Sequence, residues 1–388
     1  MKIQKEASPQ PNWRWAKLKD LVVFQRGFDI TKNEQKDGSV PVISSSGIRS
    51  FHSEVKVCGP GVIIGRKGTL GTVHFSESDY WPHDTTLWSK DFKGNNSRYV
   101  YYFIQTLGLE QYNVGNANPT LNRNHIHELE IRIPSIHIQR RIANILSVYD
   151  DLIENNRRRI KLLEQSARLL YKEWFVRLRF PGHEHVKIKD GVPEGWEEKN
   201  IGEICETVGG GTPSTSKPEY WTDGDITWVV PTDVTRNDCL ALIDSEKKIT
   251  TAGLRASSAK MVPPDTILMT SRASVGFFAI MEKEVCTNQG FINIIPFEDH
   301  MRMYLLHNLL YRVEEIRSHA GGATYKEINK SRFRGLSILV PHRELLPQFN
   351  EIAFQLLKQT RVLQQHRAKL VRARDMLLPR LMNGEIAV

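Results

Sequence analysis

The sequence predicts an α+β protein in which two similar mixed α/β domains are separated by two long helices that pair as an antiparallel coiled coil. Three observations predict this fold. Segments 129–134 and 336–341 both alternate apolar residues and end in proline, which is typical of a strand. A heptad pattern follows each segment at one constant offset, which indicates a long helix. Trp13 opens the first half as Trp196 opens the second. A repeat this long is a duplicated domain plus helix rather than a solenoid unit.

The chain is expected to divide into four segments. Residues 1–134 and 181–341 form the two globular domains, and residues 135–180 and 342–388 form the two helical regions. Short apolar runs bounded by Gly, Asn and Pro predict strands at 40–43, 62–65, 70–75, 226–230, 267–270 and 291–295. Helices within the domains are expected near 99–111 and 303–318.

In the first long helix, apolar positions alternate spacings of four and three from Ile142 to Trp174, and this period predicts a coiled coil. Pro181 and Gly182 are expected to end the segment. The second helix has an apolar residue at every seventh position, and Pro379 and Gly384 are expected to break it. Its second row is predicted to be Leu345, Ile352, Gln359, His366 and Ala373. The side chains predicted to pair the helices are Ile142, Tyr149, Asn156, Leu163, Leu170, Phe349, Leu356, Leu363, Leu370 and Leu377.

Two helices with matching patterns on one chain pair most simply with each other, and the alternation of domain and helix makes the pair antiparallel. Core helices of one compact domain and a homodimeric zipper are the alternatives. Asn156 either fixes the register as a buried polar residue or is solvated beside an imperfect seam. The run Arg157-Arg158-Arg159 is a DNA phosphate contact, a protein contact or a solvated face.

Composition describes an ordinary globular protein with a basic character. The chain has 388 residues, of which 40% are apolar and 25% charged, which suits two or three domains. Its 53 Lys and Arg against 44 Asp and Glu give a formal charge of +9. This charge favours a polyanionic partner, most often nucleic acid, over a basic protein without such a partner.

The cysteines and the apolar runs exclude two further classes. Cys58, Cys205, Cys239 and Cys286 have no metal-ligand spacing, so we expect no metal site and reduced thiols. No apolar run reaches the roughly 18 residues of a membrane helix, and the first twelve residues are polar. We therefore expect a cytoplasmic protein with no membrane partner.

A search for catalytic motifs finds none. The sequence has no GxxxxGK[ST] phosphate loop, no GxSxG, no HExxH and no kinase motif set, and it lacks the motifs of an amino-methylating DNA methyltransferase. His83-Asp84-Thr85 invites an acid–base interpretation, but no third partner is evident, so a polar turn or a DNA-facing loop is preferred. We predict no catalytic residue and no cofactor bound by this chain.

Polar loops beside short strands recur in both domains. Segment 62–71 parallels 267–276, so that Lys67 coincides with Arg272. A strand that brings a cation and a hydroxyl into a glycine turn suits contact with phosphates and base edges, and a structural turn with an exposed cation is the alternative. The residues predicted to contact DNA are Ser45, Arg66, Lys67, Thr69, His83, Asp84, Asn116, Asn118, Thr232, Asp233, Arg272, Ser274, Asn288, Gln289, Thr324 and Lys326.

With these features, the chain resembles a specificity subunit of a type I restriction-modification system. Gly210-Gly211-Thr212-Pro213-Ser214, Tyr220-Trp221 and Ile226-Thr227-Trp228-Val229 resemble the opening of that family's target recognition domain. Asp151-Leu152-Ile153-Glu154 and Trp174-Phe175 resemble its central conserved region, and Leu377-Leu378-Pro379-Arg380-Leu381 its C-terminal copy. The first domain departs from the pattern, since Gln25-Arg26-Gly27-Phe28-Asp29-Ile30 replaces the Gly-Thr-Pro turn.

The resemblance implies that each domain recognises one half of a bipartite asymmetric target on double-stranded DNA, and that the helices act as spacer and docking surface. It implies two methyltransferase subunits, which carry S-adenosylmethionine, and restriction subunits, which use ATP and Mg. The specificity subunit of a related two-subunit restriction enzyme and a non-specific DNA-binding coiled-coil tether are the alternatives. A stand-alone methyltransferase or nuclease is disfavoured by the missing motifs.

Overall fold

The computed structural model describes residues 12–112, 120–322 and 326–388 of the chain. The chain forms two compact units. Unit 1 is Met1–Ile153 with Lys369–Val388, and unit 2 is Glu154–Ala368. Each unit has its own principal hydrophobic core. Each of the two long helices contributes one segment to unit 1 and another to unit 2.

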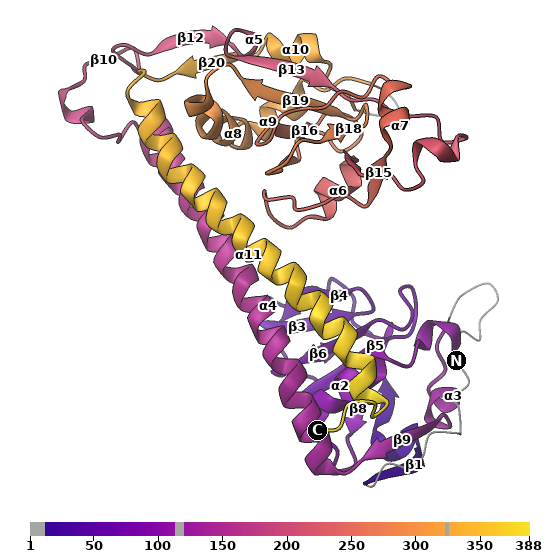
Figure 1. Ribbon diagram of the computed structural model, residues 1–388. Helices are drawn as coiled ribbons and strands as arrows, with labels where there is room; N and C mark the ends of the chain where they lie inside the picture. The colour runs from indigo at the N-terminus through magenta and orange to yellow at the C-terminus, as the bar shows by residue number, and fades with distance from the viewer. Residues whose placement is uncertain (1–11, 113–119, 323–325) are drawn as a thin grey trace. The chain divides into compact units, whose positions relative to one another are not determined.

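Unit 1 contains three small sheets and several short helices (Figure 1). Its elements are β1 (Trp13–Lys17), α1 (Leu18–Leu21), β2 (Val23–Arg26), β3 (Val40–Ser44), β4 (Gly47–His52), β5 (Gly61–Gly65), β6 (Val73–Ser76), β7 (Trp81–Pro82), β8 (Thr86–Asp91), α2 (Ser97–Gln105), η1 (Leu109–Tyr112), α3 (Arg123–His127) and β9 (Glu130–Pro134). The strand orders are β1-β9, β2-β8-β5-β6 and β4-β3-β7. Helix α4 (Ile136–Tyr171) follows directly.

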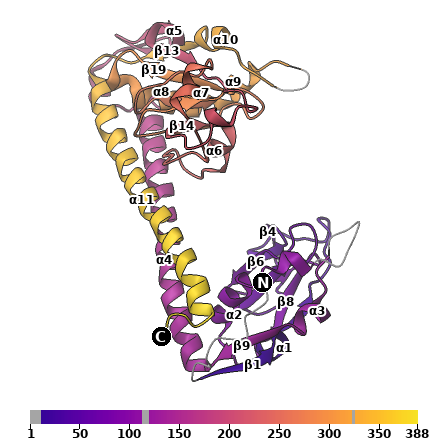
Figure 2. The same cartoon turned by 45° about the vertical axis from the view of Figure 1, so that its right-hand side comes forward.

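Unit 2 repeats these three sheets and adds the two-stranded sheet β10-β11 (Figure 2). Its elements are η2 (Lys172–Val176, π-helical), η3 (His183–His185), β10 (Ile188–Lys189), β11 (Val192–Pro193), β12 (Glu197–Asn200), α5 (Ile201–Ile204), β13 (Cys205–Gly209), η4 (Pro218–Tyr220), β14 (Ile226–Val229), α6 (Pro231–Arg236), β15 (Lys247–Ile249), α7 (Thr251–Arg255), β16 (Ile267–Thr270), β17 (Phe278–Ile280), β18 (Cys286–Thr287), β19 (Phe291–Pro296), η5 (Asp299–Met301), α8 (Arg302–Tyr311), α9 (Val313–Ser318), α10 (Lys330–Arg334) and β20 (Ser337–Val340). Helix α11 (Leu345–Met382) follows.

The sheet topology confirms the predicted duplication. The orders β12-β20, β13-β19-β16-β17 and β15-β14-β18 of unit 2 match those of unit 1 strand for strand. In both units the three-stranded sheet contains one parallel pair, β3 with β7 and β14 with β18. The two alternating segments that end in proline are β9 and β20, and each pairs antiparallel with the opening strand of its own unit.

In each unit a segment of α4 packs antiparallel to a segment of α11. In unit 2 the ring of Trp174, which follows α4, lies 5.9 Å from that of Phe349 near the start of α11. In unit 1 the Asp150 carboxylate accepts a hydrogen bond of 2.7 Å from Arg374 near the end of α11. The predicted α+β fold with two similar mixed domains and two long pairing helices is confirmed.

The ten side chains predicted to pair the helices are all buried or half-buried. Asn156 is among the buried ones, with 9% of its surface exposed. Within the helical cores, Ile142 and Leu146 lie in one cluster with Leu381, and Ile160 lies in another with Leu363. These clusters also contain domain residues, so each helix is shared between its partner helix and a globular domain.

Five sequence expectations need correction. The predicted second row of α11 is wrong in its middle, because Ile352 is 45% exposed whereas Ala353 and Thr360 are buried. The second buried row of α11 therefore lies four residues after each residue of the heptad row that includes Phe349 and Leu356. This second row is on the side of the helix that faces the domain. Pro379 does not end α11, since a proline in the last turn forfeits a single backbone hydrogen bond. The helix continues to Met382 and ends before Gly384, whose φ is 80°, so the break expected at Gly384 is confirmed.

The other corrections concern element bounds. The helix expected near 99–111 ends at Gln105, and η1 follows as a separate turn after Gly108, whose φ is 57°. The strand expected at 70–75 begins only at Val73, because Gly71 adopts a positive φ of 73° in the preceding turn. The helix expected at 303–318 is divided into α8 and α9 at Arg312, whose φ of −99° and ψ of 20° depart from helical values.

Candidate nucleic-acid interface

The first candidate loop is the turn that joins β5 to β6 and, in unit 2, β16 to β17. The Gly71 N–H donates to the Gly65 carbonyl at 3.0 Å, and the Gly276 N–H donates to the Thr270 carbonyl at 2.9 Å. Gly71 and Gly276 both have positive φ, at 73° and 80°. The two turns therefore share one backbone geometry, and the sequence correspondence between them is a structural one.

This geometry makes Lys67 and Arg272 equivalent. Each forms an isolated antiparallel bridge to a later loop, Lys67 with Thr120 and Arg272 with Glu327. Both cations are exposed, and the Arg272 guanidinium lies 3.6 Å from the Glu327 carboxylate. The backbone thus holds each cation at a fixed place on its turn while its charged end faces solvent.

The second candidate loop follows β7 in unit 1 and β18 in unit 2. A Cβ atom on Gly27 would lie 2.1 Å from the His83 carbonyl oxygen, and one on Gly210 would lie 2.2 Å from the Thr287 carbonyl oxygen. No side chain fits at such distances, so glycine is needed where these loops touch. The residue after each glycine donates its N–H to an equivalent carbonyl, Phe28 to Pro82 at 2.8 Å and Gly211 to Thr287 at 2.9 Å. Pro82 and Thr287 are therefore equivalent, so that His83 corresponds to Asn288 and Asp84 to Gln289.

In unit 2 the two loops meet and enclose a pocket of about 320 Å³. It is lined by Pro231, Arg272, Ala273, Asn288, Gln289 and Gly290. Three of these, Arg272, Asn288 and Gln289, were predicted from sequence to contact DNA. Asn288 Oδ1 accepts the Gly290 N–H at 2.9 Å, and Gln289 Oε1 accepts the Thr212 hydroxyl. Both amides are therefore oriented by the protein before any ligand arrives.

The remaining predicted residues of unit 2 are less well suited to base contact. The Asp233 carboxylate accepts the N–H groups of Val230 at 2.9 Å and Glu246 at 3.2 Å, so it caps α6 and supports the backbone. Ser274 is half-buried, whereas Thr232 and Lys326 are exposed. Predicted residue Thr324 lies outside the described residues.

In unit 1 the equivalent region is a cluster of charges. An Arg26 Nη2 atom lies 3.0 Å from Asp84 Oδ2, and the Arg66 guanidinium lies 3.5 Å from the Asp84 carbonyl oxygen. Arg66 is half-buried, and this burial together with the charge of Arg26 lowers the pKa of the Arg66 guanidinium. One arginine thus pairs with the Asp84 carboxylate, and a second contacts the backbone of the same residue.

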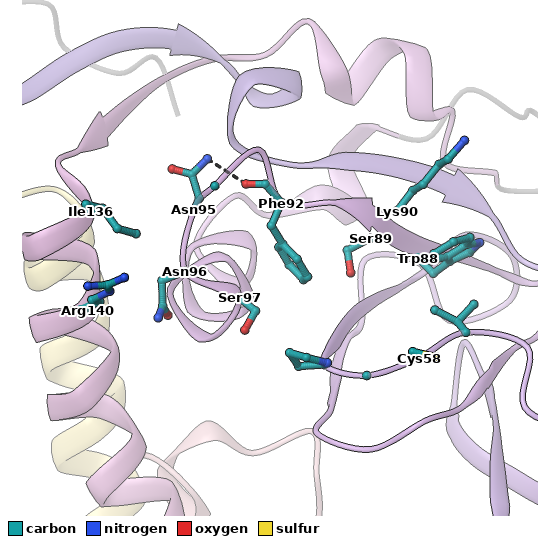
Figure 3. A pocket seen from close by; sticks show the side chains of 14 residues that line it. Cys58, Trp88, Ser89, Lys90, Phe92, Asn95, Asn96, Ser97, Ile136 and Arg140 are labelled. Atoms are coloured by element: carbon teal, nitrogen blue, oxygen red, sulfur yellow. Dashed lines mark hydrogen bonds between the residues drawn. The ribbon is translucent and has the colours of Figure 1, made fainter.

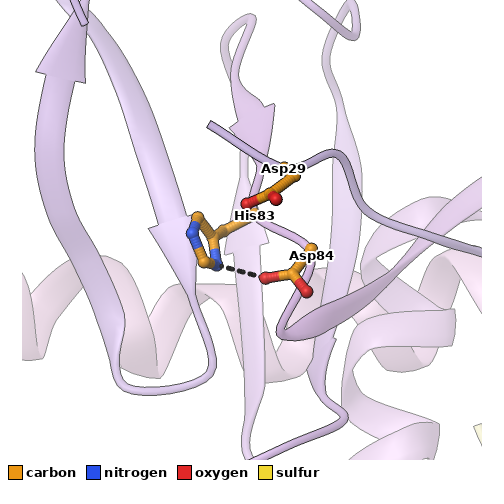
Figure 4. A group of neighbouring side chains, drawn as sticks. All are labelled: Asp29, His83 and Asp84. Atoms are coloured by element: carbon orange, nitrogen blue, oxygen red, sulfur yellow. Dashed lines mark ion pairs between the residues drawn. The ribbon is translucent and has the colours of Figure 1, made fainter. Parts of the chain in front are cut away.

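Two more polar groups adjoin that carboxylate (Figure 4). His83 is buried, and its Nδ1 lies 3.1 Å from Asp84 Oδ1. Potential metal-ligating atoms of Asp29, His83 and Asp84 all lie within 4.8 Å of one another. Among the described residues this is the single group of three or more His, Cys, Asp or Glu side chains with such spacing.

The other predicted residues of unit 1 are divided between interior and surface. Ser45 is buried, and its carbonyl oxygen accepts the Thr72 hydroxyl at 2.6 Å, so it supports the turn from inside. Thr69 is exposed on that turn. Asn116 and Asn118 lie outside the described residues.

Sequence reasoning did not select Arg26, although it noted the segment that contains it. The signal was a cation immediately before the glycine that aligns with Gly210. Its partner Asp84 is 58 positions away, so only the folded chain shows that the two side chains meet.

A further pocket of unit 1, of about 530 Å³, lies beside the N-terminus of α2 (Figure 3). Its lining includes Lys90, Asn95, Asn96 and Arg140, and the Asn95 amide is held by the Phe92 carbonyl oxygen at 3.0 Å. Its lining as described contains none of the residues predicted to contact DNA.

The helices of unit 2 hold their domain by ion pairs. Arg361, with 7% of its side chain exposed, pairs with Asp265, and Arg367 donates to Asp238 at 2.7 Å. The Arg367 hydrogen bonds hold the pKa of Asp238 below its usual range. Arg157 lies 3.6 Å from the same Asp238 carboxylate, so this member of the arginine run has an intramolecular partner.

The cysteine and membrane expectations can also be set against the structure. Cys205, Cys239 and Cys286 are buried free thiols, and their burial raises the pKa of each to about 12. Cys58 is free and exposed. Across 12–112, 120–322 and 326–388, no helix has both the length and the apolar character required to cross a membrane.

Comparison with known proteins identifies the family. The family model described as type I restriction modification DNA specificity domain matches residues 11–165 and 193–370. The type I restriction enzyme MjaIX specificity subunit of Methanocaldococcus jannaschii is 34% identical over 182 residues, which are 45% of this chain and 42% of that protein. The chain thus aligns with less than half the length of that relative. The type I restriction enzyme HindI specificity subunit of Haemophilus influenzae is 24% identical over 332 residues, 69% of this chain and 71% of that protein.

A solved structure shows the same fold. The crystal structure of the type I restriction-modification system S subunit from M. genitalium matches with a TM-score of 0.66, covers 98% of both chains and is 18% identical. Because the family model covers more than half of the chain, in two regions that fall one in each half, the chain belongs to the type I restriction-modification DNA specificity domain family.

Proposed function

We propose that this protein is the DNA sequence-recognition subunit of a type I restriction-modification complex, and that each domain recognises one half of a bipartite, asymmetric target. One observation carries the proposal. Both units place two loops in the same backbone arrangement but carry different side chains on them, Arg26 and Asp84 in unit 1 against Gly209 and Gln289 in unit 2. Equivalent frames with different polar groups suit the reading of two different base sequences.

The charge of the loops supports DNA as the ligand. Lys67, Arg66 and Arg272 lie on the equivalent turns, and the whole chain has a formal charge of +9. Cations at such turns contact phosphates and fix the orientation of a protein on the duplex, while the amides and the guanidinium groups can reach base edges. Binding should therefore weaken with salt and also depend on sequence.

The helices serve in this proposal as spacer and docking surface. α4 and α11 each contribute to both units, so their length sets how far apart the two domains can engage DNA. Apolar side chains of α4 are exposed, among them Val148 at 56%, Leu162 at 61% and Leu169 at 60%. Exposed apolar groups on a helix are a suitable surface for a protein partner. The partners in this proposal are two methyltransferase subunits and the restriction subunits.

The chemistry belongs to those partners. S-adenosylmethionine and adenine methylation are assigned to the methyltransferase subunits, and ATP, Mg and DNA cleavage to the restriction subunits. This chain contributes binding and orientation alone, and it works in the cytoplasm beside the DNA.

Genome-wide detection of N6-methyladenine tests the proposal. Cells would carry this gene, its methyltransferase gene, or both. A split motif of two short half-sites around a fixed gap, seen only with both genes, is expected. No methylated motif despite a purified complex of the two proteins would refute it, and salt-titrated binding to random DNA would then identify a non-specific tether.

A further inference from the structure

The strongest unexplained arrangement is the charge cluster of unit 1, in which the Asp84 carboxylate pairs with Arg26 and the Asp84 carbonyl oxygen accepts a hydrogen bond from Arg66. We propose that Arg26, oriented by Asp84, reads a guanine in the half-site recognised by unit 1. This inference rests on the proposed function and adds to it one residue and one base.

The backbone of Arg26 is fixed from both sides. Arg26 is the last residue of β2 and pairs with Leu87 of β8. Its carbonyl oxygen accepts the indole N–H of Trp88 at 3.2 Å, and the next residue, Gly27, donates its N–H to the Thr86 carbonyl at 3.0 Å. The side chain therefore starts from a defined point rather than from a flexible loop.

Asp84 fixes the other end of that side chain. Its Oδ2 lies 3.0 Å from an Arg26 Nη2, and the Asp84 side chain is 18% exposed, whereas Arg26 is 54% exposed. A guanidinium group has five N–H donors, and among the described residues Asp84 is the one hydrogen-bond partner of this group. The other N–H donors of the Arg26 guanidinium face solvent, where they can bind a ligand.

A planar fork of N–H donors matches one base edge above all. Guanine presents the O6 and N7 acceptors side by side in the major groove, and arginine donates to both. An arginine that only neutralises phosphate needs no orienting carboxylate, because its charge suffices. An oriented guanidinium with exposed donors is therefore better suited to a base edge than to the backbone.

The same carboxylates could instead hold a cation, since Asp29, His83 and Asp84 cluster closely. Arg26 already occupies the cation position beside Asp84, and the Arg66 guanidinium lies 3.5 Å from the Asp84 carbonyl oxygen. A divalent ion there would have two guanidinium groups as near neighbours, which is electrostatically unfavourable. The cluster is thus better explained as the support that positions Arg26.

Unit 2 lacks this device. Gly27 and Gly210 occupy equivalent positions, so Gly209 stands where unit 1 has Arg26. Gln289 likewise follows Asn288 where Asp84 follows His83, so an amide stands in unit 2 where unit 1 has the carboxylate. The proposed guanine contact is therefore specific to unit 1, and losing it should change one half-site only.

The test is methylation-motif mapping in cells that express the chain with its methyltransferase partner, using wild type, Arg26→Ala and Arg26→Lys. Wild type should show an invariant guanine in one half-site. Both variants should admit other bases at that position, with discrimination reduced about 10- to 100-fold, while the second half-site and the gap stay unchanged. Arg26→Lys keeps the charge but loses the fork, so it separates base reading from phosphate contact.

Arg49→Ala is the matched control, because Arg49 is an exposed cation of β4 in the same unit. It should leave the motif unchanged. An unchanged motif in Arg26→Ala, or one restored by Arg26→Lys, would overturn the inference, as would a wild-type motif without an invariant guanine in either half-site. An intact second half-site in the variants shows that the protein folds and assembles. A wild-type complex that methylates no bipartite motif would instead refute the proposed function itself.

Discussion

His307 should make the stability of unit 2 depend on pH. It lies on α8 and is 2% exposed, between the rings of Tyr171 at 6.2 Å and Phe349 at 5.9 Å. Within the described part of the chain, neither of its ring nitrogens has a hydrogen-bond partner. Burial, assisted by the charge of Arg168, lowers the pKa of the His307 imidazole to about 3.

The direction of the effect follows from where the proton binds. Below the usual pKa of 6.5 the unfolded chain takes up a proton at this imidazole, whereas the folded chain keeps it neutral down to a pH near 3. The unfolded state therefore binds more protons in this window, and stability falls as pH falls. At pH 5, which is 1.5 units below the pKa of the imidazole in the unfolded chain, protonation of the unfolded state lowers the stability of the folded state by about 2 kcal/mol.

Urea unfolding at pH 7 and pH 5 measures this cost. His307→Leu removes the titrating group and keeps a side chain of similar volume, so the loss of stability between pH 7 and pH 5 should be smaller than in wild type by about 2 kcal/mol. Carboxylates and the other histidines titrate in both proteins and cancel. The control is His185→Leu, at a side chain that is 84% exposed. This variant should lose as much stability between pH 7 and pH 5 as wild type does. Equal pH dependence in wild type and His307→Leu would refute the reasoning.

Three further predictions concern the framework. Asp265→Asn leaves the buried Arg361 unpaired and should lower the free energy of unfolding by about 3–5 kcal/mol. Glu246→Gln removes one charge of an exposed pair and should lower it by less than about 1 kcal/mol. Similar losses for the two variants in urea titrations would contradict this prediction. Gly27→Ala places a Cβ against the His83 carbonyl and should destabilise unit 1 by about 1–3 kcal/mol in thermal unfolding. Gly335→Ala should be tolerated, because the nearest atom to its Cβ would be 3.6 Å away. A Gly27→Ala protein as stable as wild type would count against the tight contact. A heptad inserted after Ile153 and another after Ala368 add about 10 Å of helix and should widen the unread gap of the methylated motif by about three base pairs without changing either half-site. An altered half-site or an unchanged gap would refute the spacer role.

The elements that sequence predicted well are those with a local signal. Alternation over 129–134 and 336–341 and the heptads behind them gave β9, β20, α4 and α11, because a periodic apolar face records which side of an element is buried. The parallel between segments 62–71 and 267–276 also gave the correspondence of Lys67 with Arg272. Backbone geometry was implied there by the repeated glycines, which few conformations can replace.

Tertiary structure decided everything that depends on which surfaces meet. The second buried row of α11 includes Ala353 and Thr360 because the helix packs on a domain as well as on α4, and a heptad pattern alone does not show that second contact. Ser45 and His83 share the polar character of their exposed neighbours, yet the fold buries both.

The candidate site divides in the same way. By itself the sequence determined the duplicated plan, the two pairs of polar loops and the glycines on which the loops rest, because these are patterns within one segment or between repeats. Only the folded chain brought Arg26 to Asp84, and Arg272 to Asn288 and Gln289 around one pocket. Such meetings arise from sheet order and loop packing between segments distant in sequence, which no local periodicity encodes.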